Sequence, residues 1–324
     1  MTRNSKAKTI ALSILFATVV IVSYSLLMVR EVKIPSHPDY ILIAIIVYLV
    51  GWLMSALRLR ILHEILDGKV LRITDYFKAR ILGGFLAYIT PSGIGGEVAR
   101  AFYLSAKAKG NFSRYFALAL LEAYYDIMVI NIIALGFSII AWPLSIPVIL
   151  VGLGNLAFWL TAYYVLKHLI TPDKVRRPFS KIISYIMKTI EKYERLQNGY
   201  TDFAESFAKV TDKIGFKDKL VVVTITLVYQ VLFGLTAFMV YASFTGDLGI
   251  TAALDSVIGY IYSNCLSSLP TPGGSISAEY GLSLVLPPGT VVLTRIIIYY
   301  TPIILGLIIM YREKILEQVL QKYL

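Results

Sequence analysis

The sequence has few of the residues on which most enzyme and metal chemistry depends. It contains one cysteine and three histidines among 324 residues. A lone cysteine excludes an intramolecular disulfide framework, and so few Cys and His residues argue against a zinc module. A Walker-type glycine loop is missing as well. The sequence therefore predicts a protein that is not an enzyme and that uses no metal and no cofactor.

Charged residues are also scarce, while apolar residues are in excess. Only 16% of the residues are charged, compared with roughly 25% in soluble domains, whereas 57% are hydrophobic and the mean hydropathy is +0.71. Such a chain cannot bury its apolar surplus in its own core. Six apolar segments are close to the roughly 20 residues that cross a bilayer, and they lie at 10–29, 40–57, 115–140, 144–166, 220–244 and 291–310. We therefore expect an all-α integral membrane protein.

The positive charges lie between these segments. The formal net charge is +11, which by itself would suggest nucleic acid as a partner, but 27 of the 31 Lys and Arg fall in the loops of one side. Arg30 and Lys33 are on the other side. Because basic loops stay in the cytoplasm, we expect both termini to be cytoplasmic, the protein to reside in the cell membrane, and no nucleic acid to be bound.

Two further apolar stretches, 81–105 and 250–286, are interrupted by proline and glycine, and the flanks of each stretch lie on one side. This pattern predicts two re-entrant hairpins, the first entering from the cytoplasm and the second from outside. Broken backbone at membrane depth is tolerated only where protein buries it or where it lines a watery cavity. The residues that break the helices are Pro91, Gly93, Gly95 and Gly96 in the first stretch and Pro270, Pro272, Gly273 and Gly274 in the second.

The order of a span, a broken segment followed by a glutamate, and another span occurs twice, at about 40–140 and about 220–311. The two copies have opposite orientation, which is typical of the inverted repeats of secondary transporters. The alternative is that proline and glycine only kink two helices for packing. The predicted organisation is an anchor helix and loop at 1–39, a first repeat with an extra helix at 40–166, a cytoplasmic linker at 167–219 and a second repeat at 220–324.

Seven ionisable residues are predicted to lie at membrane depth, where each centrally placed charge costs at least about 2.5–3.5 kcal/mol. Two pairs among them are three and four residues apart, so each pair shares a helix face. We expect a polar groove that binds a charged head group or a coupling ion; the alternative is a buried network that only fixes helix register. The seven are Glu97, Arg100, Glu122, Asp126, Asp255, Glu279 and Arg295.

The linker from Thr171 to Lys219 has apolar residues at helical spacing and predicts two amphipathic helices. Their basic faces are expected to lie along the anionic inner leaflet, although a hairpin that merely connects the repeats is the alternative. The histidines, His37, His63 and His168, fall in predicted loops or at span ends and are expected to be solvated.

The stretch from Pro91 to Arg100, with its Gly-Glu-x-x-Arg core, and the Pro-Thr-Pro-Gly-Gly motif at 270–274 that is followed by Glu279 carry a further signal. Together with the Glu-bearing span and the basic linker, they resemble the lysylphosphatidylglycerol synthetase transmembrane region, a membrane-embedded flippase family. The resemblance covers nearly the whole chain. It implies translocation of phospholipids or lipid-linked head groups between leaflets. The soluble aminoacyl-transferase domain of the bacterial synthetases is not in the sequence, so lipid synthesis is not implied.

The function expected from these features is that of a lipid translocase whose partners are membrane lipids, such as a phospholipid or a polyprenyl-phosphate-linked substrate. Two alternatives remain open at this stage. One is a secondary transporter of a small soluble substrate, whose cavity would be sealed from lipid. The other is an integral-membrane lipid-phosphate transferase, in which buried carboxylates and arginines would bind a diphosphate.

Overall fold

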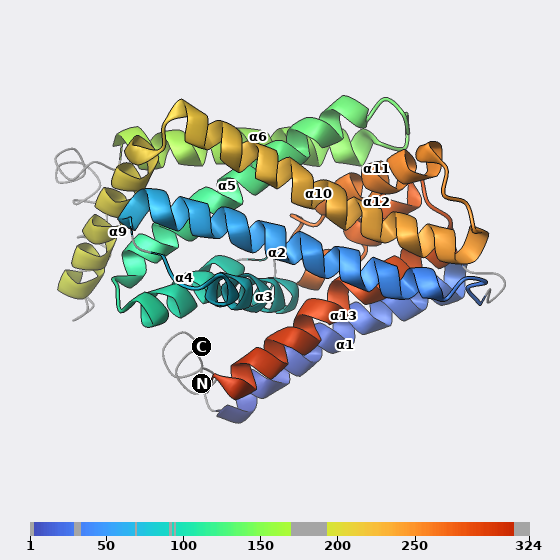
Figure 1. The fold of residues 1–324 in the computed structure, drawn as a ribbon, viewed down its shortest axis with the longest axis horizontal. Helices are drawn as coiled ribbons and strands as arrows, with labels where there is room; N and C mark the ends of the chain where they lie inside the picture. Colours follow the sequence, from blue (N-terminus) through green and yellow to red (C-terminus); the bar gives the residue numbers. More distant parts are fainter. Residues whose placement is uncertain are drawn as a thin grey trace.

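The computed structural model describes residues 3–28, 34–68, 70–90, 93, 95–169 and 193–313. Within these ranges the chain is helical and contains no β-strand (Figure 1). The elements are α1 (Arg3–Met28), α2 (Asp39–Asp67), α3 (Ile73–Ile89), α4 (Gly95–Ala108), α5 (Phe112–Phe137), α6 (Ile146–Tyr164), a π-helical turn η2 (Val165–Leu169), α9 (Tyr193–Lys213), α10 (Phe216–Thr245), α11 (Ile250–Leu266), a 3-10 turn η3 (Pro272–Gly274), α12 (Ser277–Ser283) and α13 (Pro288–Arg312).

Five helices of the described chain, α2, α5, α6, α10 and α13, are long and apolar enough to cross a membrane, and α1 contributes a shorter apolar segment, Leu12–Met28. These are the six segments that the hydropathy pattern predicts. Helix α6 buries only Val148 and Gly152 among its own residues, while Leu150 and Phe158 are exposed. A helix with so little buried apolar surface is stable in lipid rather than in water. The expectation of an all-α membrane protein is therefore confirmed.

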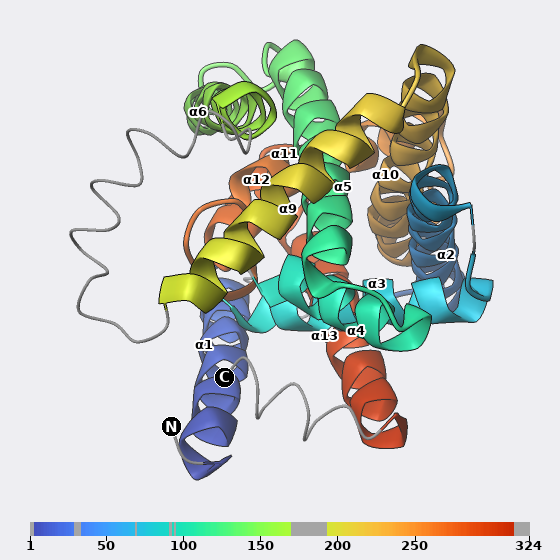
Figure 2. The ribbon, with the colours of Figure 1, turned by 90° about the vertical axis from the view of Figure 1, so that its left-hand side faces the viewer.

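Helices α2 and α10 pack along each other on one face of the bundle, in front in Figure 1 and at the right-hand edge in Figure 2. The pairs α3 with α4 and α11 with α12 are shorter than a membrane span, and within each pair the two helices are packed together. Viewed from one end, α3 and α4 lie across the lower end of α5 while α9 runs obliquely across the bundle (Figure 2). Helix α4 can approach α3 closely because both contact positions are glycine: a Cβ on Gly96 would lie 2.9 Å from the carbonyl oxygen of Gly83.

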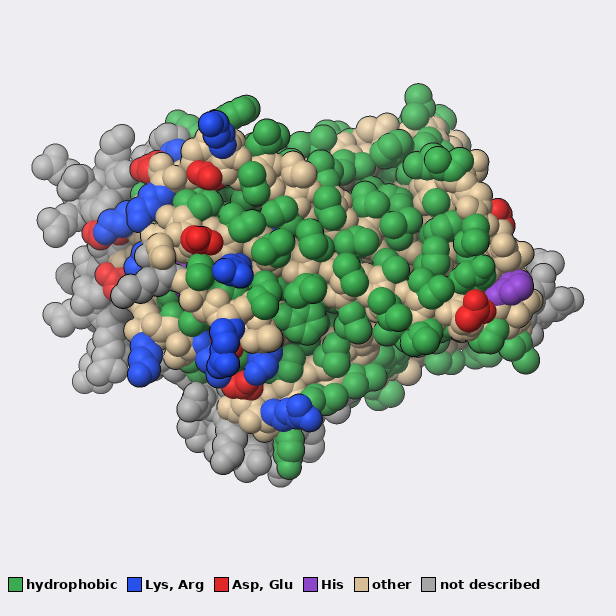
Figure 3. Space-filling view, viewed as in Figure 1, with side chains coloured by type: hydrophobic (Ala, Val, Ile, Leu, Met, Phe, Trp, Pro, Cys, Tyr) green, Lys and Arg blue, Asp and Glu red, His purple; other side chains and the backbone are tan. Residues whose placement is uncertain are grey.

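The space-filling view shows Lys and Arg gathered at one end of the molecule and an apolar belt along the middle (Figure 3). The start of α1 and the end of α13 lie at this basic end. There, Glu313 at the end of α13 binds Lys78 of α3 and Lys107 of α4, with 2.7 Å between the Lys107 Nζ and a carboxylate oxygen. These two lysines lower the pKa of the Glu313 carboxyl by hydrogen bonding to it. The contact ties α13 to both helices of the first short pair.

Helix α9 covers the same end. Its apolar face, with Phe207 and Val210 buried, packs against α5. Lys213 of α9 and Arg114 of α5 both donate to the carbonyl oxygen of Leu66, at 2.7 and 3.2 Å, and so place positive charge at the C-terminus of α2. Helix α9 is the second of the two predicted amphipathic helices. The first lies outside the described residues, which omit 170–192.

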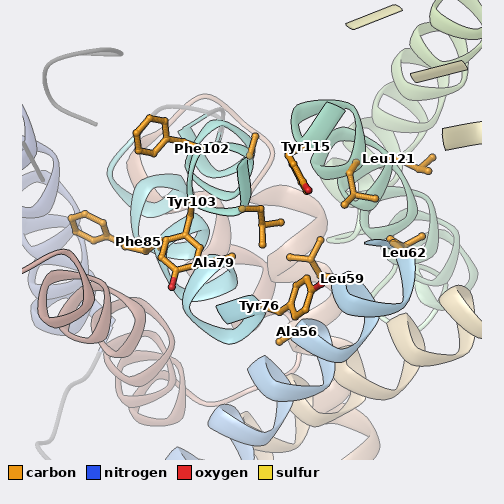
Figure 4. Close-up of a cluster of buried hydrophobic side chains, with 14 of the residues drawn as sticks. Ala56, Leu59, Leu62, Tyr76, Ala79, Phe85, Phe102, Tyr103, Tyr115 and Leu121 are labelled. Carbon is orange, nitrogen blue, oxygen red and sulfur yellow. The ribbon is translucent and has the colours of Figure 1, made fainter. Parts of the chain in front are cut away.

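The prediction that His63 is solvated is wrong. The predicted span ends at 57, whereas α2 continues to Asp67 and carries His63 into the bundle. The Nδ1 of His63 lies 2.6 Å from the hydroxyl of Tyr76 and its Nε2 lies 3.2 Å from that of Tyr115. Tyr76 and Tyr115 belong to a hydrophobic cluster with Leu59 and Leu62 (Figure 4). His37 is exposed as predicted, and the side chain of His168 lies outside the described residues.

Candidate functional site

The largest group of buried charges forms around Arg58, which is fully buried near the middle of α2. Its Nη2 lies 2.9 Å from Glu122 Oε1 and donates at 3.0 Å to Asp126 Oδ2, and its Nη1 also binds Asp126. Nη1 donates further to Thr226 Oγ1 of α10 at 2.7 Å. The predicted i, i+4 pair of carboxylates on α5 therefore shares one guanidinium, and α2, α5 and α10 meet at this point.

Two more arginines converge on the same carboxylate from the first short pair of helices. Arg80 of α3 lies 3.1 Å and Arg100 of α4 lies 3.2 Å from Glu122 Oε2. Arg100 also donates to Glu97 Oε1 at 2.8 Å. We call this set of residues the three-arginine cluster: Arg58, Arg80, Arg100, Glu97, Glu122 and Asp126.

The three-arginine cluster contains three positive and three negative side chains. Its charges balance when all are ionised, as buried charges require if they are not to be uncompensated. Glu122 is its centre, with both carboxylate oxygens buried and ion-paired, although neither makes a well-oriented hydrogen bond with the described residues. Tyr229 of α10 donates its hydroxyl hydrogen to Asp126, and its ring lies 5.0 Å from the Arg58 guanidinium carbon.

A second buried ion pair joins the other short pair of helices to α13. Arg295 Nε donates to Glu279 Oε1 of α12 at 2.7 Å, and both side chains are at most 3% exposed. The Nη2 of Arg295 donates to the carbonyl oxygen of Gly273 at 2.9 Å, and the amide of Ile276 donates to Glu279 Oε2 at 2.6 Å. The Glu279–Arg295 pair therefore holds the broken segment between α11 and α12 at two backbone positions.

The proline–glycine segments interrupt the helices where the sequence predicts. Helix α3 ends at Ile89 and α4 begins at Gly95, and α11 ends at Leu266 and α12 begins at Ser277. Gly93, Gly273 and Gly274 have φ values of +71°, +61° and +64°, which favour glycine. Pro91 lies outside the described residues, whereas Pro270 and Pro272 fall in the segment between α11 and α12.

The second broken segment also contacts the end of the first short pair. A Cβ on Gly273 would meet the Tyr299 ring and would lie 3.3 Å from the carbonyl oxygen of Tyr88 in the last turn of α3. The ring centroids of Tyr88 and Tyr299 are 5.5 Å apart, and the ring planes meet at 67° in an edge-to-face contact. Tyr299 of α13, one turn after Arg295, therefore joins the last turn of α3 to the second broken segment.

The structure brings together six of the seven ionisable residues singled out by the sequence, in two groups. Asp255 joins neither; it lies in the second turn of α11, partly exposed, with no ion pair to a described residue.

Sequence reasoning missed Arg58 and Arg80, because both were assigned to a cytoplasmic loop at 58–80. The signal that could have found Arg58 is the apolar pattern of Leu59, Leu62 and Leu66, which continues past it at helical spacing. Within the described residues no three His, Cys, Asp or Glu side chains gather as a metal site would need.

Comparison with known proteins identifies the family of the chain. A family model described as the lysylphosphatidylglycerol synthase TM region matches residues 9–306. Searches of curated proteins and of solved structures found no match. The matched region contains all helices from α2 to α12, both short helix pairs and both groups of buried charges. The chain therefore belongs to the lysylphosphatidylglycerol synthase TM region family.

Proposed function

We propose that the protein is a lipid translocase, a flippase that moves a phospholipid or lipid-linked head group between the leaflets of the cell membrane, and that it is not an enzyme. The observation that carries this proposal is the burial of four arginines inside an apolar bundle. Two of them lie on the first short helix pair, and the other two lie on the spans α2 and α13, which pack against the short pairs. Charges at such depth are expensive and mark substrate or ion pathways. A guanidinium can bind two phosphate oxygens at once.

The two short helix pairs are proposed to be re-entrant hairpins of an inverted repeat. Contacts between helices support this proposal, because they recur in two matching sets. Helix α2 packs on α3 as α10 packs on α11, and α3 packs on α13 as α11 packs on α5. The central contact of α2 with α10 then joins the two equivalent helices. In such folds the substrate site lies near the midplane, between the repeats.

In this mechanism the head group would pass between the Glu279–Arg295 pair and the three-arginine cluster, past Tyr88 and Tyr260. Hydroxyl and guanidinium groups would replace the water that a phosphate loses, so the head group would avoid the full cost of desolvation. The tails would stay in lipid. A transporter of a small soluble substrate would need the same polar groups but a path that is closed to lipid. The exposed apolar face of α6 favours the lipid translocase, because it offers a surface along which acyl tails could move.

Cysteine labelling should establish the topology. In a Cys265→Ser background, cysteines at Asp247 and Gly289 should react with a membrane-impermeant thiol reagent added outside, and a cysteine at Lys109 should react only after permeabilisation. The reason is that Lys109 lies at the basic end, which is expected to be cytoplasmic. The background substitution is mild because the Cys265 thiol donates to Asn131 Oδ1, which a serine hydroxyl can also do. Reaction of Gly289→Cys from the cytoplasmic side alone would contradict the inverted repeat.

Translocation itself should be measurable in liposomes. The purified chain should equilibrate a fluorescent phospholipid between leaflets without ATP, which dithionite quenching reports as a loss of the protected inner-leaflet fraction. Arg100→Lys and Arg295→Lys should each slow translocation of a phosphate-bearing lipid by about tenfold. Lysine keeps the positive charge but cannot form bidentate hydrogen bonds with two phosphate oxygens.

Arg72→Lys is the matched control, because the side chain of Arg72 is 90% exposed and lies outside both groups of buried charges. It should translocate lipid at the wild-type rate. If liposomes with and without the protein quench to the same plateau for every lipid class tried, the translocase proposal is wrong, and a lipid-phosphate transferase becomes the better interpretation.

A further inference from the structure

The Glu279–Arg295 pair has no net charge, and this limits what it can bind. Both side chains are buried, with one carboxylate compensating one guanidinium. An anionic phosphate that enters this site would leave one negative charge without a partner. Uncompensated buried charges are strongly disfavoured, and a carboxylate in that position becomes neutral by taking up a proton. The pair can accept an anion only if Glu279 leaves Arg295 or is protonated.

The surroundings of Glu279 offer no other positive charge within the part of the chain that the structure describes. Arg295 binds it from α13, Tyr299 of the same helix packs on Gly273 beside it, and Tyr24 of α1 packs against the cluster that contains Leu282 of α12. From α11, the backbone of Tyr262 and Ser263 lies against α12 at Gly281. A second anion here would therefore have to share Arg295 with Glu279.

The site also contains a hydrogen-bond donor that the resting structure does not use. The hydroxyl of Tyr299 is fully buried and has no hydrogen-bond partner among the described residues. Tyr299 lies one turn after Arg295 on α13, and its ring packs on the Gly273 backbone whose carbonyl Arg295 binds. A buried unused hydroxyl costs free energy unless a partner arrives, and a phosphate oxygen at Arg295 would be such a partner.

We infer that Glu279 is a proton-exchanging counter-ion: a phosphate-bearing head group takes its place on Arg295 while Glu279 takes up one proton, so that lipid binding is coupled to a proton. This inference rests on the proposed function and adds the coupling ion to it. The proton comes from the solvent and its buffer, so an O–H or N–H bond of the donor acid breaks as the O–H bond of Glu279 forms, and no other covalent bond changes. The guanidinium then keeps one anionic partner throughout.

The exchange would also act on the broken segment. Glu279 Oε2 accepts the amide hydrogen of Ile276, a residue with a φ of +77°, which is costly for a β-branched side chain. Arg295 holds the carbonyl of Gly273 three residues earlier. When the head group draws Arg295 away and Glu279 is neutral, both backbone anchors weaken. Binding and protonation would thereby release the segment between α11 and α12, which contacts Tyr88 of α3.

Calorimetry on the full chain in detergent tests the coupling without requiring transport. Short-chain phosphatidylglycerol is titrated into the protein at neutral pH in two buffers with different ionisation enthalpies, and the difference in heat gives the number of protons taken up. The wild type should take up about one proton per lipid bound. Glu279→Gln should bind at least as well with no uptake, and Arg295→Gln should weaken binding by about tenfold or more.

Inorganic phosphate serves as the second probe and distinguishes a head-group site from a site for the free anion. The lipid should bind with one proton taken up and phosphate should bind more weakly, because it lacks the glycerol and acyl contacts. Glu205→Gln is the control variant; it removes an exposed carboxylate from α9 and should retain the wild-type uptake. Wild-type binding without proton uptake, wild-type uptake in Glu279→Gln, or no binding of either probe would each overturn the inference.

The same preparations in liposomes separate this inference from the proposed function. If the wild type translocates lipid but takes up no proton on binding, the flippase proposal is supported and the proton coupling is contradicted. If lipid binds with uptake of one proton but no lipid is translocated, the proton-coupled site is supported and the flippase proposal is contradicted.

Discussion

Replacing Glu122 with glutamine should lower the free energy of unfolding by about 3–5 kcal/mol, the range measured when one partner of a buried ion pair is removed. The substitution changes almost no volume but removes the negative charge on which Arg58, Arg80 and Arg100 converge. Three buried guanidinium groups would then face only two carboxylates. Thermal or denaturant unfolding of the purified protein in detergent would measure the loss.

A compensating variant sharpens this test. Adding Arg80→Gln to Glu122→Gln restores equal numbers of positive and negative side chains in the three-arginine cluster, so the double variant should be more stable than Glu122→Gln alone. Glu205→Gln, which removes a carboxylate from an exposed pair with Lys209, should cost less than about 1 kcal/mol. A Glu122→Gln protein as stable as the wild type would show that the cluster does not hold α2, α3, α4 and α5 together.

Replacing Gly281 with alanine should also be damaging, for a steric rather than an electrostatic reason. A Cβ at this position would lie 2.5 Å from the backbone nitrogen and 2.6 Å from the Cα of Ser263 on α11. Backbone atoms cannot rotate away as a side chain can, so α11 and α12 would have to separate. We expect a loss of about 1–3 kcal/mol or more, together with slower lipid translocation because the Glu279–Arg295 pair would be displaced.

Gly136→Ala and Gly154→Ala provide matched controls in α5 and α6. A Cβ at either position would meet nothing within 4 Å. Both glycines are helical, so alanine should leave stability unchanged or raise it by up to about 1 kcal/mol. Equal unfolding temperatures for Gly281→Ala and these two variants would contradict the close packing of α11 on α12.

The losses of stability expected for Glu122→Gln and Gly281→Ala both arise in parts of the structure that the proposed mechanism uses. Glu122 lies where the first short helix pair meets the spans, and Gly281 lies where the second pair folds back on itself. A variant that loses translocation but keeps its stability would separate transport from architecture. Glu279→Gln preserves side-chain volume but leaves the buried Arg295 without its carboxylate, so it should lose stability as well, and its translocation is to be compared with that of Glu122→Gln at equal folded fraction.

Much of the architecture could be predicted from the sequence, because it depends on local properties of the chain. Long apolar runs predict the spans, the distribution of Lys and Arg predicts one basic end, and proline with glycine predicts that helices end near Ile89 and Leu266. The motif around Glu97 and Arg100 also indicates the family correctly. Each of these signals is complete within a few tens of residues.

The identity of the charge partners could be decided only by the tertiary structure. Arg58 pairs with Asp126, 68 residues away, and with Thr226, 168 residues away. Because Arg58 is charged, hydropathy predicts that the membrane span ends at residue 57. In the structure α2 continues to Asp67, and Arg58 and His63 lie inside the bundle, where groups on α5 and α10 bind the Arg58 guanidinium. Hydropathy assigns each residue a fixed cost, but the actual cost of a buried charge depends on which groups the fold places beside it.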